Sequence, residues 1–141
     1  MDFKPTYTPE QEVFRKEVRA WAEANVPKIE GNPDSDENYA KMRQVGRDLG
    51  AKGWLRPTAP KEYGGGGLTF EQSVILNEEL DKFGVGLPPY YDSGGRLGGA
   101  SILVWGTEEQ KQRFLPPIFK GEVVTWQLLT APEAGSDLAG T

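Results

Sequence analysis

The stretch TFEQSVILNEELDKF, residues 69–83, carries both signals that indicate the fold class of this chain. Thr69 and Gln72 have the spacing of a capping box, in which the threonine hydroxyl and the glutamine side chain each bond to the other residue's backbone amide. The apolar residues that follow recur at the spacing of one helix face. They are Phe70, Val74, Ile75, Leu76, Leu80 and Phe83. The stretch therefore predicts a helix from Phe70 to Phe83, the most buried helix of the chain.

The same capping pattern occurs twice more, before other apolar-periodic runs. Thr8 with Gln11 predicts a helix over residues 9–25, and Thr107 with Gln110 predicts one over 108–119 that Pro116-Pro117 should kink or shorten. Two further helices are expected from about Asp36 to Leu49 and from Gly94 to Gly106, where glycine is a common stop signal. The chain is therefore predicted to be mainly α.

The helix periodicity also predicts which side chains are buried. The first helix should bury the face that holds Val13, Phe14, Val18, Trp21 and Ala22. Across the later helices we expect core positions for Val74, Leu80 and Phe114 as well.

Two other local patterns have an ordinary structural explanation. Neighbouring residues on a helix point about 100° apart, so Glu78-Glu79 and Glu108-Glu109 are predicted to lie on solvated faces and not to form a catalytic carboxylate pair. The run Gly64 to Gly67 lacks the neighbours of a GxGxxG or GxxxxGK[ST] motif, which favours a turn over a phosphate site.

Composition excludes several classes of function. The 141 residues include 16 Lys and Arg, 21 Asp and Glu, and neither Cys nor His. A disulfide framework, a thiolate nucleophile, a Ser-His-Asp triad and an ordinary zinc site are therefore excluded, and no metal site is expected. Charges of both signs alternate along the chain, unlike the basic footprint of a nucleic-acid-binding protein. Neither a signal peptide nor an apolar run of about 18 residues is evident, so we expect no membrane span and a cytoplasmic location.

The hydrophobic period changes near the C-terminus. Residues 122–130, EVVTWQLLT, are rich in β-branched and aromatic side chains and predict a strand. A single strand cannot pair its own backbone groups, so its partner strands are expected to be missing from this sequence. We therefore divide the chain into a helical domain, residues 1–121, and the beginning of an incomplete β-domain, residues 122–141. The segment TAPEAGSD, residues 130–137, could approach an anionic or heteroaromatic ligand closely or could be a simple turn.

Two stretches of the chain resemble the acyl-CoA dehydrogenases. GTEEQKQRFLPPIFKGEVVTWQLLTAPEAGSDLAG, residues 106–140, is similar to that family at the junction of its N-terminal helical domain and its middle β-domain. Gly53-Trp54-Leu55 and the segment PKEYGG, residues 60–65, resemble the family's loop between its second and third helices. Together the similarities span nearly the whole chain. They imply an N-terminal helical bundle with a C-terminal β-strand that begins the next domain.

The resemblance also implies a cofactor, FAD, and the residues that contact it. It assigns four residues to the flavin, namely Gln127, Leu128, Leu129 and Thr130. It assigns Gly135 and Ser136 to the cofactor pyrophosphate and Ser136 also to the acyl-CoA substrate. The turn departs from the family's usual Thr-Glu-Pro, because Ala131 stands before Pro132. The family's catalytic glutamate lies in a C-terminal domain, so no catalytic residue is expected in this chain.

The reaction implied is α,β-dehydrogenation of an acyl-CoA thioester in lipid metabolism, with hydride transfer to FAD and reoxidation by an electron acceptor. The chain would then be a fragment of such an enzyme, inactive alone, and the intact enzyme a homo- or hetero-oligomer. An acyl-CoA oxidase or a flavin monooxygenase of the same fold is an alternative. A non-enzymatic helical interaction module is another, because core packing alone explains every apolar stripe.

Overall fold

A computed structural model describes residues 6–128. It contains α1 (Pro9–Asn25), α2 (Asp36–Ala51), a short 3₁₀-helix η1 (Lys61–Tyr63), α3 (Phe70–Asp81), α4 (Ser93–Trp105) and α5 (Glu108–Phe119). The prediction of a mainly α fold is confirmed. Across this part of the chain, no helix combines the length and apolar character needed to cross a bilayer.

The three threonine caps form as predicted. At α1 the Gln11 amide donates to Thr8 Oγ1 over 3.2 Å, and the Thr8 amide donates to Gln11 Oε1 over 2.8 Å. The same reciprocal bonds form at Thr69 and Thr107. Each cap satisfies amides that the first helical turn leaves without intrahelical partners, which explains why the predicted starts are correct.

One helix ends earlier than the sequence predicts, and another ends at its predicted residue. Helix α3 ends at Asp81, two residues before the predicted Phe83, because the chain turns at Gly84 with a φ of 70°. The Val85 amide closes this turn by donating to the Leu80 carbonyl over 3.1 Å. Helix α5 instead continues through Pro116 and Pro117 to Phe119, its predicted end.

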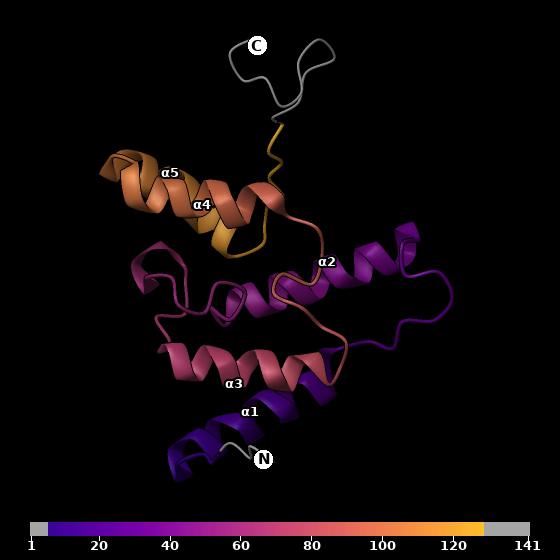
Figure 1. The fold of residues 1–141 in the computed structure, drawn as a ribbon. Coiled ribbons are helices and arrows are strands. Elements are labelled where there is room, and N and C mark those ends of the chain that lie inside the picture. The colour runs from indigo at the N-terminus through magenta and orange to yellow at the C-terminus, as the bar shows by residue number, and fades with distance from the viewer. Residues whose placement is uncertain (1–5, 129–141) are drawn as a thin grey trace, which may run out of the picture.

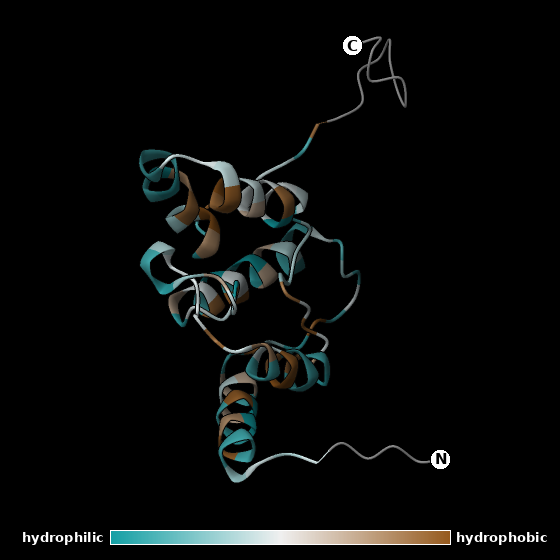
Figure 2. Ribbon diagram, turned by 60° about the vertical axis from the view of Figure 1, so that its left-hand side comes forward, coloured by the Kyte–Doolittle hydropathy of each residue, from teal (hydrophilic) through white to brown (hydrophobic). Residues whose placement is uncertain are grey.

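The helices form two packed pairs with α2 between them (Figure 1). Helix α1 lies beside α3, and α4 lies beside α5. In Figure 2 each helix carries both hydrophobic and hydrophilic residues, as expected for helices with one buried face. One core joins α1, α2 and α3 and consists of Val18, Ala22, Val45, Leu49, Trp54, Leu55, Leu76, Leu80 and Val85. A second core lies between α5 and η1 and consists of Tyr63, Leu115, Ile118 and Phe119.

Several predicted core positions are exposed instead. Leu80 is fully buried as predicted, and Trp21 is partly buried against the first core. Val74 and Phe114, however, are 39% and 41% exposed. Two other predicted core positions are also exposed, Val13 on α1 at 67% and Phe70 on α3 at 74%. The apolar arcs of these helices are wider than the faces that the neighbouring helices cover.

Glu79, in contrast, was predicted to be exposed and is buried. It was expected on a solvated face, and the expectation is wrong because its side chain is 0% exposed. Arg15 Nη1 donates to it over 2.6 Å, Arg19 Nε donates over 3.0 Å, and Lys82 completes the set. Burial by itself raises the pKa of the Glu79 carboxyl, but these donors outweigh burial and lower the pKa from 4.5 to about 2. The carboxylate therefore stays charged and joins α1 to α3.

The glycine run after η1 is a turn, as predicted. The amides of Gly64, Gly65, Gly66 and Gly67 donate to carbonyls within residues 56–61. A Cβ at Gly65 would lie 2.3 Å from the Ala59 carbonyl oxygen, so the loop has no room for a side chain there. The four amides hold the loop together instead of presenting a phosphate cradle.

Candidate functional site

The C-terminal segment lies against the beginning of α4. Residues 122–130 were predicted to form a strand, but no strand is present over 122–128, and Leu129 and Thr130 lie outside the described residues. A strand requires a ladder of bonds to a neighbouring strand. Here the backbone bonds instead to the helix start, since the Gly94 amide donates to the Thr125 carbonyl over 3.0 Å.

Asp92 is the residue that connects this segment to the helical domain. It caps α4, and its side chain is 1% exposed. Its Oδ1 accepts from the Gly95 amide over 2.9 Å, from the Thr125 amide over 3.1 Å and from the Thr125 hydroxyl over 3.2 Å. Its Oδ2 accepts from Arg56 Nη2 over 2.8 Å. One carboxylate thus ties together the helix start, the loop before η1 and the C-terminal segment.

The sequence reasoning missed Asp92. An aspartate directly before Ser93-Gly94-Gly95 is a recognisable N-cap signal, and it could have indicated where α4 begins. The contacts with Arg56 and Thr125 could not have been found in this way, because 36 and 33 residues separate these partners from Asp92.

The close approach of the two segments depends on Gly94. A Cβ at this position would lie 2.6 Å from the Thr125 carbonyl carbon, a distance that real side chains do not show. The preceding residue, Ser93, accepts a longer bond of 3.4 Å from the Gln127 amide. Residues 125–127 are therefore held along the first turn of α4.

A cavity of about 270 Å³ opens beside this contact, between α4, α5 and the C-terminal segment. Its lining residues are Gly94, Leu97, Gly98, Ser101, Ile102, Ile118, Thr125, Trp126 and Gln127. A Cβ on Gly98 would meet no atom within 4 Å, so the helix surface is open at this point. Trp126 is 62% exposed and packs on Tyr91 with 5.2 Å between ring centroids. We call this cavity the α4 groove; it can accommodate an apolar chain beside an aromatic wall.

The predicted site residues divide into two groups. Gln127 and Leu128 are described; both are exposed, Leu128 to 89%, and Gln127 also lines the α4 groove. Leu129, Thr130, Gly135 and Ser136 lie outside the described residues, so the assignment of this set to FAD and acyl-CoA stays a prediction. Within residues 6–128, no group of three or more acidic side chains is placed to hold a metal ion.

Comparison with known proteins identifies the helical domain. Residues 8–122 match the family described as acyl-CoA dehydrogenase, N-terminal domain. The short-chain specific acyl-CoA dehydrogenase of Clostridium acetobutylicum is 37% identical over 137 residues, which cover 97% of this chain and 35% of that protein. The 3-(aryl)acrylate reductase of Clostridium sporogenes is 32% identical over 131 residues, covering 93% of this chain and 34% of that protein.

A solved structure shows the same arrangement of helices. The ChsE4-ChsE5 complex from Mycobacterium tuberculosis superposes with a TM-score of 0.70 and 32% identity, covering 99% of this chain and 35% of the matched chain. The chain spans about a third of the length of the curated relatives it matches. The family match over residues 8–122 and the structural superposition agree, and the chain belongs to the acyl-CoA dehydrogenase family, of which it carries the N-terminal domain.

Proposed function

We propose that this chain is the N-terminal part of an FAD-dependent acyl-CoA dehydrogenase and that the junction at Asp92 positions its cofactor-binding segment. The observation that carries the proposal is the set of bonds from Asp92 and Gly94 to Thr125. The predicted flavin contacts begin two residues later, at Gln127. These three hydrogen bonds fix the backbone at Thr125, so the residues that directly follow it have little freedom in their position.

The described end of this segment is compatible with FAD. Trp126, Gln127 and Leu128 are exposed beside the α4 groove, so their side chains and backbone are accessible to a ligand. We propose that Gln127, Leu128, Leu129 and Thr130 contact the flavin, that Gly135 and Ser136 contact the pyrophosphate, and that Ser136 also contacts the substrate. FAD, when bound, accepts the β-hydrogen of the acyl group as hydride.

The α4 groove is the proposed site of the acyl chain. Leu97, Ile102 and Ile118 supply apolar walls, and Gly94 and Gly98 leave the helix surface free of side chains. An acyl chain in this groove would exclude water from the neighbouring segment, which favours removal of the α-proton and hydride transfer. The base for the α-proton is not assigned to any residue of this chain.

Exposed apolar side chains near the groove favour assembly with other chains. Val104 and Trp105 are 65% and 86% exposed at the end of α4. Large exposed apolar patches commonly mark interaction sites. We therefore propose that the intact enzyme is an oligomer whose flavin is reoxidised by a separate electron acceptor.

A reductase is the second candidate, favoured by the 32% identity to a protein named 3-(aryl)acrylate reductase. The site would then work in the opposite direction: FAD reduced by an external electron donor would supply a hydride, and a proton would complete the reduction of the α,β double bond of an acrylate-type substrate. Net oxidation of a saturated acyl-CoA supports the dehydrogenase, whereas turnover limited to reduction of an aryl acrylate supports the reductase. Hydrogen peroxide formed in proportion to substrate would instead assign an acyl-CoA oxidase.

The proposal can be tested in the full-length protein that carries this chain. Asp92→Asn keeps the side-chain size and removes the charge that holds Arg56, so flavin content per folded molecule should fall about tenfold, as expected for loss of a charge-assisted hydrogen bond. Thr130→Val and Ser136→Ala should lower flavin retention or acyl-CoA turnover. Asp34→Asn, at an exposed loop position, is the matched control. Unchanged flavin content and turnover in all three variants, with only the melting temperature lowered, would contradict the cofactor role.

A further inference from the structure

A second and larger cavity lies on the other side of α4, between that helix, α3 and the loop before η1. Its volume is about 520 Å³, within the usual range for sites that bind small molecules. Most of its wall is apolar and consists of Leu55, Ala59, Phe70, Leu87, Leu103 and Phe119. The α4 residues that line it are Gly95, Arg96, Ala100 and Leu103, which differ from those of the α4 groove.

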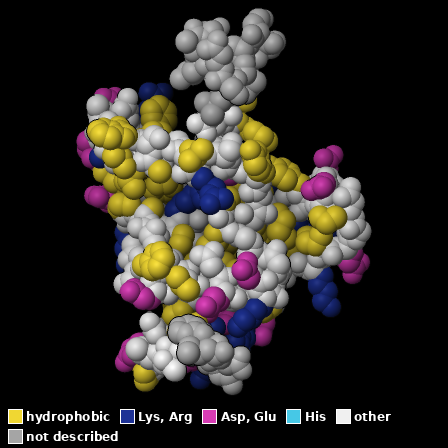
Figure 3. Space-filling view, viewed as in Figure 1, with side chains coloured by type: hydrophobic (Ala, Val, Ile, Leu, Met, Phe, Trp, Pro, Cys, Tyr) yellow, Lys and Arg dark blue, Asp and Glu magenta, His cyan; other side chains and the backbone are white. Residues whose placement is uncertain are grey.

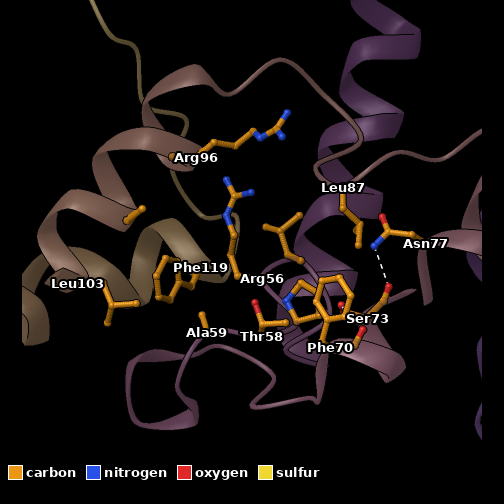
Figure 4. Close-up of a pocket in the computed structure, with 14 residues that line it drawn as sticks. Arg56, Thr58, Ala59, Phe70, Ser73, Asn77, Leu87, Arg96, Leu103 and Phe119 are labelled. Atoms are coloured by element: carbon orange, nitrogen blue, oxygen red, sulfur yellow. Dashed lines mark hydrogen bonds between the residues drawn. The ribbon is translucent and has the colours of Figure 1, made fainter. Parts of the chain in front are cut away.

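Two arginines introduce positive charge at one side of this cavity. The guanidinium groups of Arg56 and Arg96 lie near each other there, with Leu103 and Phe119 on one flank and Phe70 and Leu87 on the other (Figure 4). Figure 3 shows a cluster of Lys and Arg side chains among hydrophobic ones below the α4–α5 pair. The Arg56 side chain is only 13% exposed, whereas Arg96 is exposed to solvent, and a largely buried cation is costly unless an anion accompanies it.

The charges at this end of the cavity are not balanced within the described residues. Asp92 pairs with Arg56, whereas Arg96 has no ion pair anywhere in residues 6–128. Burial lowers the pKa of the Arg56 guanidinium, Asp92 raises it, and the neighbouring charge of Arg96 lowers it again. Nε of Arg56 is buried and has no hydrogen-bond partner among the described atoms. Two guanidinium groups with one carboxylate leave one positive charge and at least one unpaired donor.

We propose that this cavity binds an amphipathic monocarboxylate, with its carboxylate between Arg56 and Arg96 and its hydrocarbon part against Phe70, Leu87 and Phe119. A carboxylate supplies the missing negative charge and can accept paired hydrogen bonds from a guanidinium group. The hydrocarbon part would cover the ring of Phe70, which is 74% exposed. Asp92 links the site to the proposed cofactor-facing segment, because Arg56 binds Asp92 and Asp92 binds Thr125.

The charge requirement can be tested by calorimetric titration of the full-length protein with octanoate. Octanol lacks the charge, octylamine reverses it, and acetate lacks the hydrocarbon part. Octanoate should bind at least about tenfold more tightly than any of the three, since one charge-assisted contact corresponds to about a factor of ten. Equal binding of octanoate and octanol, or preference for octylamine, would overturn the proposal.

Variants then assign the binding to this cavity. Arg96→Gln is an exposed substitution and should weaken octanoate binding about tenfold. Arg113→Gln, a change at another exposed position, on α5, should alter octanoate binding less than twofold. Ala100→Phe should fill the cavity and abolish octanoate binding. Ser101→Phe fills the α4 groove instead and should leave octanoate binding unchanged. Octanoate binding that survives Ala100→Phe and is lost in Ser101→Phe would place the ligand in the acyl groove and overturn the inference, without affecting the proposed dehydrogenase function.

Discussion

Replacing Glu79 by Gln should destabilise the fold by about 3 kcal/mol at neutral pH. The substitution preserves the volume of a side chain that is fully buried between α1 and α3 and removes its charge. Arg15, itself 12% exposed, would then lose its 2.6 Å contact with the Glu79 carboxylate and keep its 2.8 Å bond to Glu78, which places the cost at the lower end of the usual range. Breaking a buried ion pair from one side generally costs about 3–5 kcal/mol.

The pKa of Glu79 gives a similar magnitude and a pH dependence. A folded-state pKa of about 2 against the ordinary 4.5 corresponds to about 3 kcal/mol at pH 7. Arg19 and Lys82 are about half exposed, so solvent screens their share and the lower end of the range applies. Because the folded-state pKa is lowered, this contribution is complete above pH 4.5 and is lost as the pH falls toward 2.

Urea unfolding of the chain, followed by tryptophan fluorescence, measures the effect. Trp21 and Trp54 pack edge to face with 5.7 Å between ring centroids in the core beside α1, so their emission should report its loss. Glu17→Gln is the control, because Glu17 is 55% exposed in its pair with Lys52 and should contribute less than about 1 kcal/mol. A Glu79→Gln variant within 0.5 kcal/mol of the wild type, or a difference that stays constant from pH 7 to pH 2, would refute the reasoning.

Three other substitutions test the packing and the caps. Leu80→Ala should cost about 2–5 kcal/mol because Leu80 is fully buried, whereas Val74→Ala at a 39% exposed site should cost less than 1 kcal/mol; equal losses of free energy of unfolding would contradict the assigned faces. Thr107→Ala should cost about 1 kcal/mol by removing the cap of α5, and an unchanged melting temperature would show that this cap is dispensable. Gly94→Ala should cost about 1–3 kcal/mol and increase hydrogen exchange at the Thr125 and Gln127 amides, since its Cβ would force residue 125 away; unchanged exchange would show that the segment adapts.

The helices themselves could be predicted because their signals are local. Each of Thr8, Thr69 and Thr107 is followed three residues later by the glutamine that completes its capping box. Four consecutive residues were therefore enough to predict each helix start. The exposure of Phe70 and Val74 could not be predicted in the same way. Periodicity shows that a helix has an apolar face, but only the placement of its neighbours shows how wide an arc of that face they cover.

In the candidate site, too, local sequence signals predicted some features and tertiary packing decided others. The sequence alone showed that the helical periodicity ends before residues 122–128. The resemblance of residues 106–140 also indicated the family to which the chain belongs. Only the tertiary structure decided that Asp92 would hold Thr125, that Arg56 and Arg96 would share a cavity, and that Glu79 would be buried among cations. Capping and periodicity act within a few residues along the chain, whereas these contacts join residues 33 to 64 positions apart, which the packing of helices brings together.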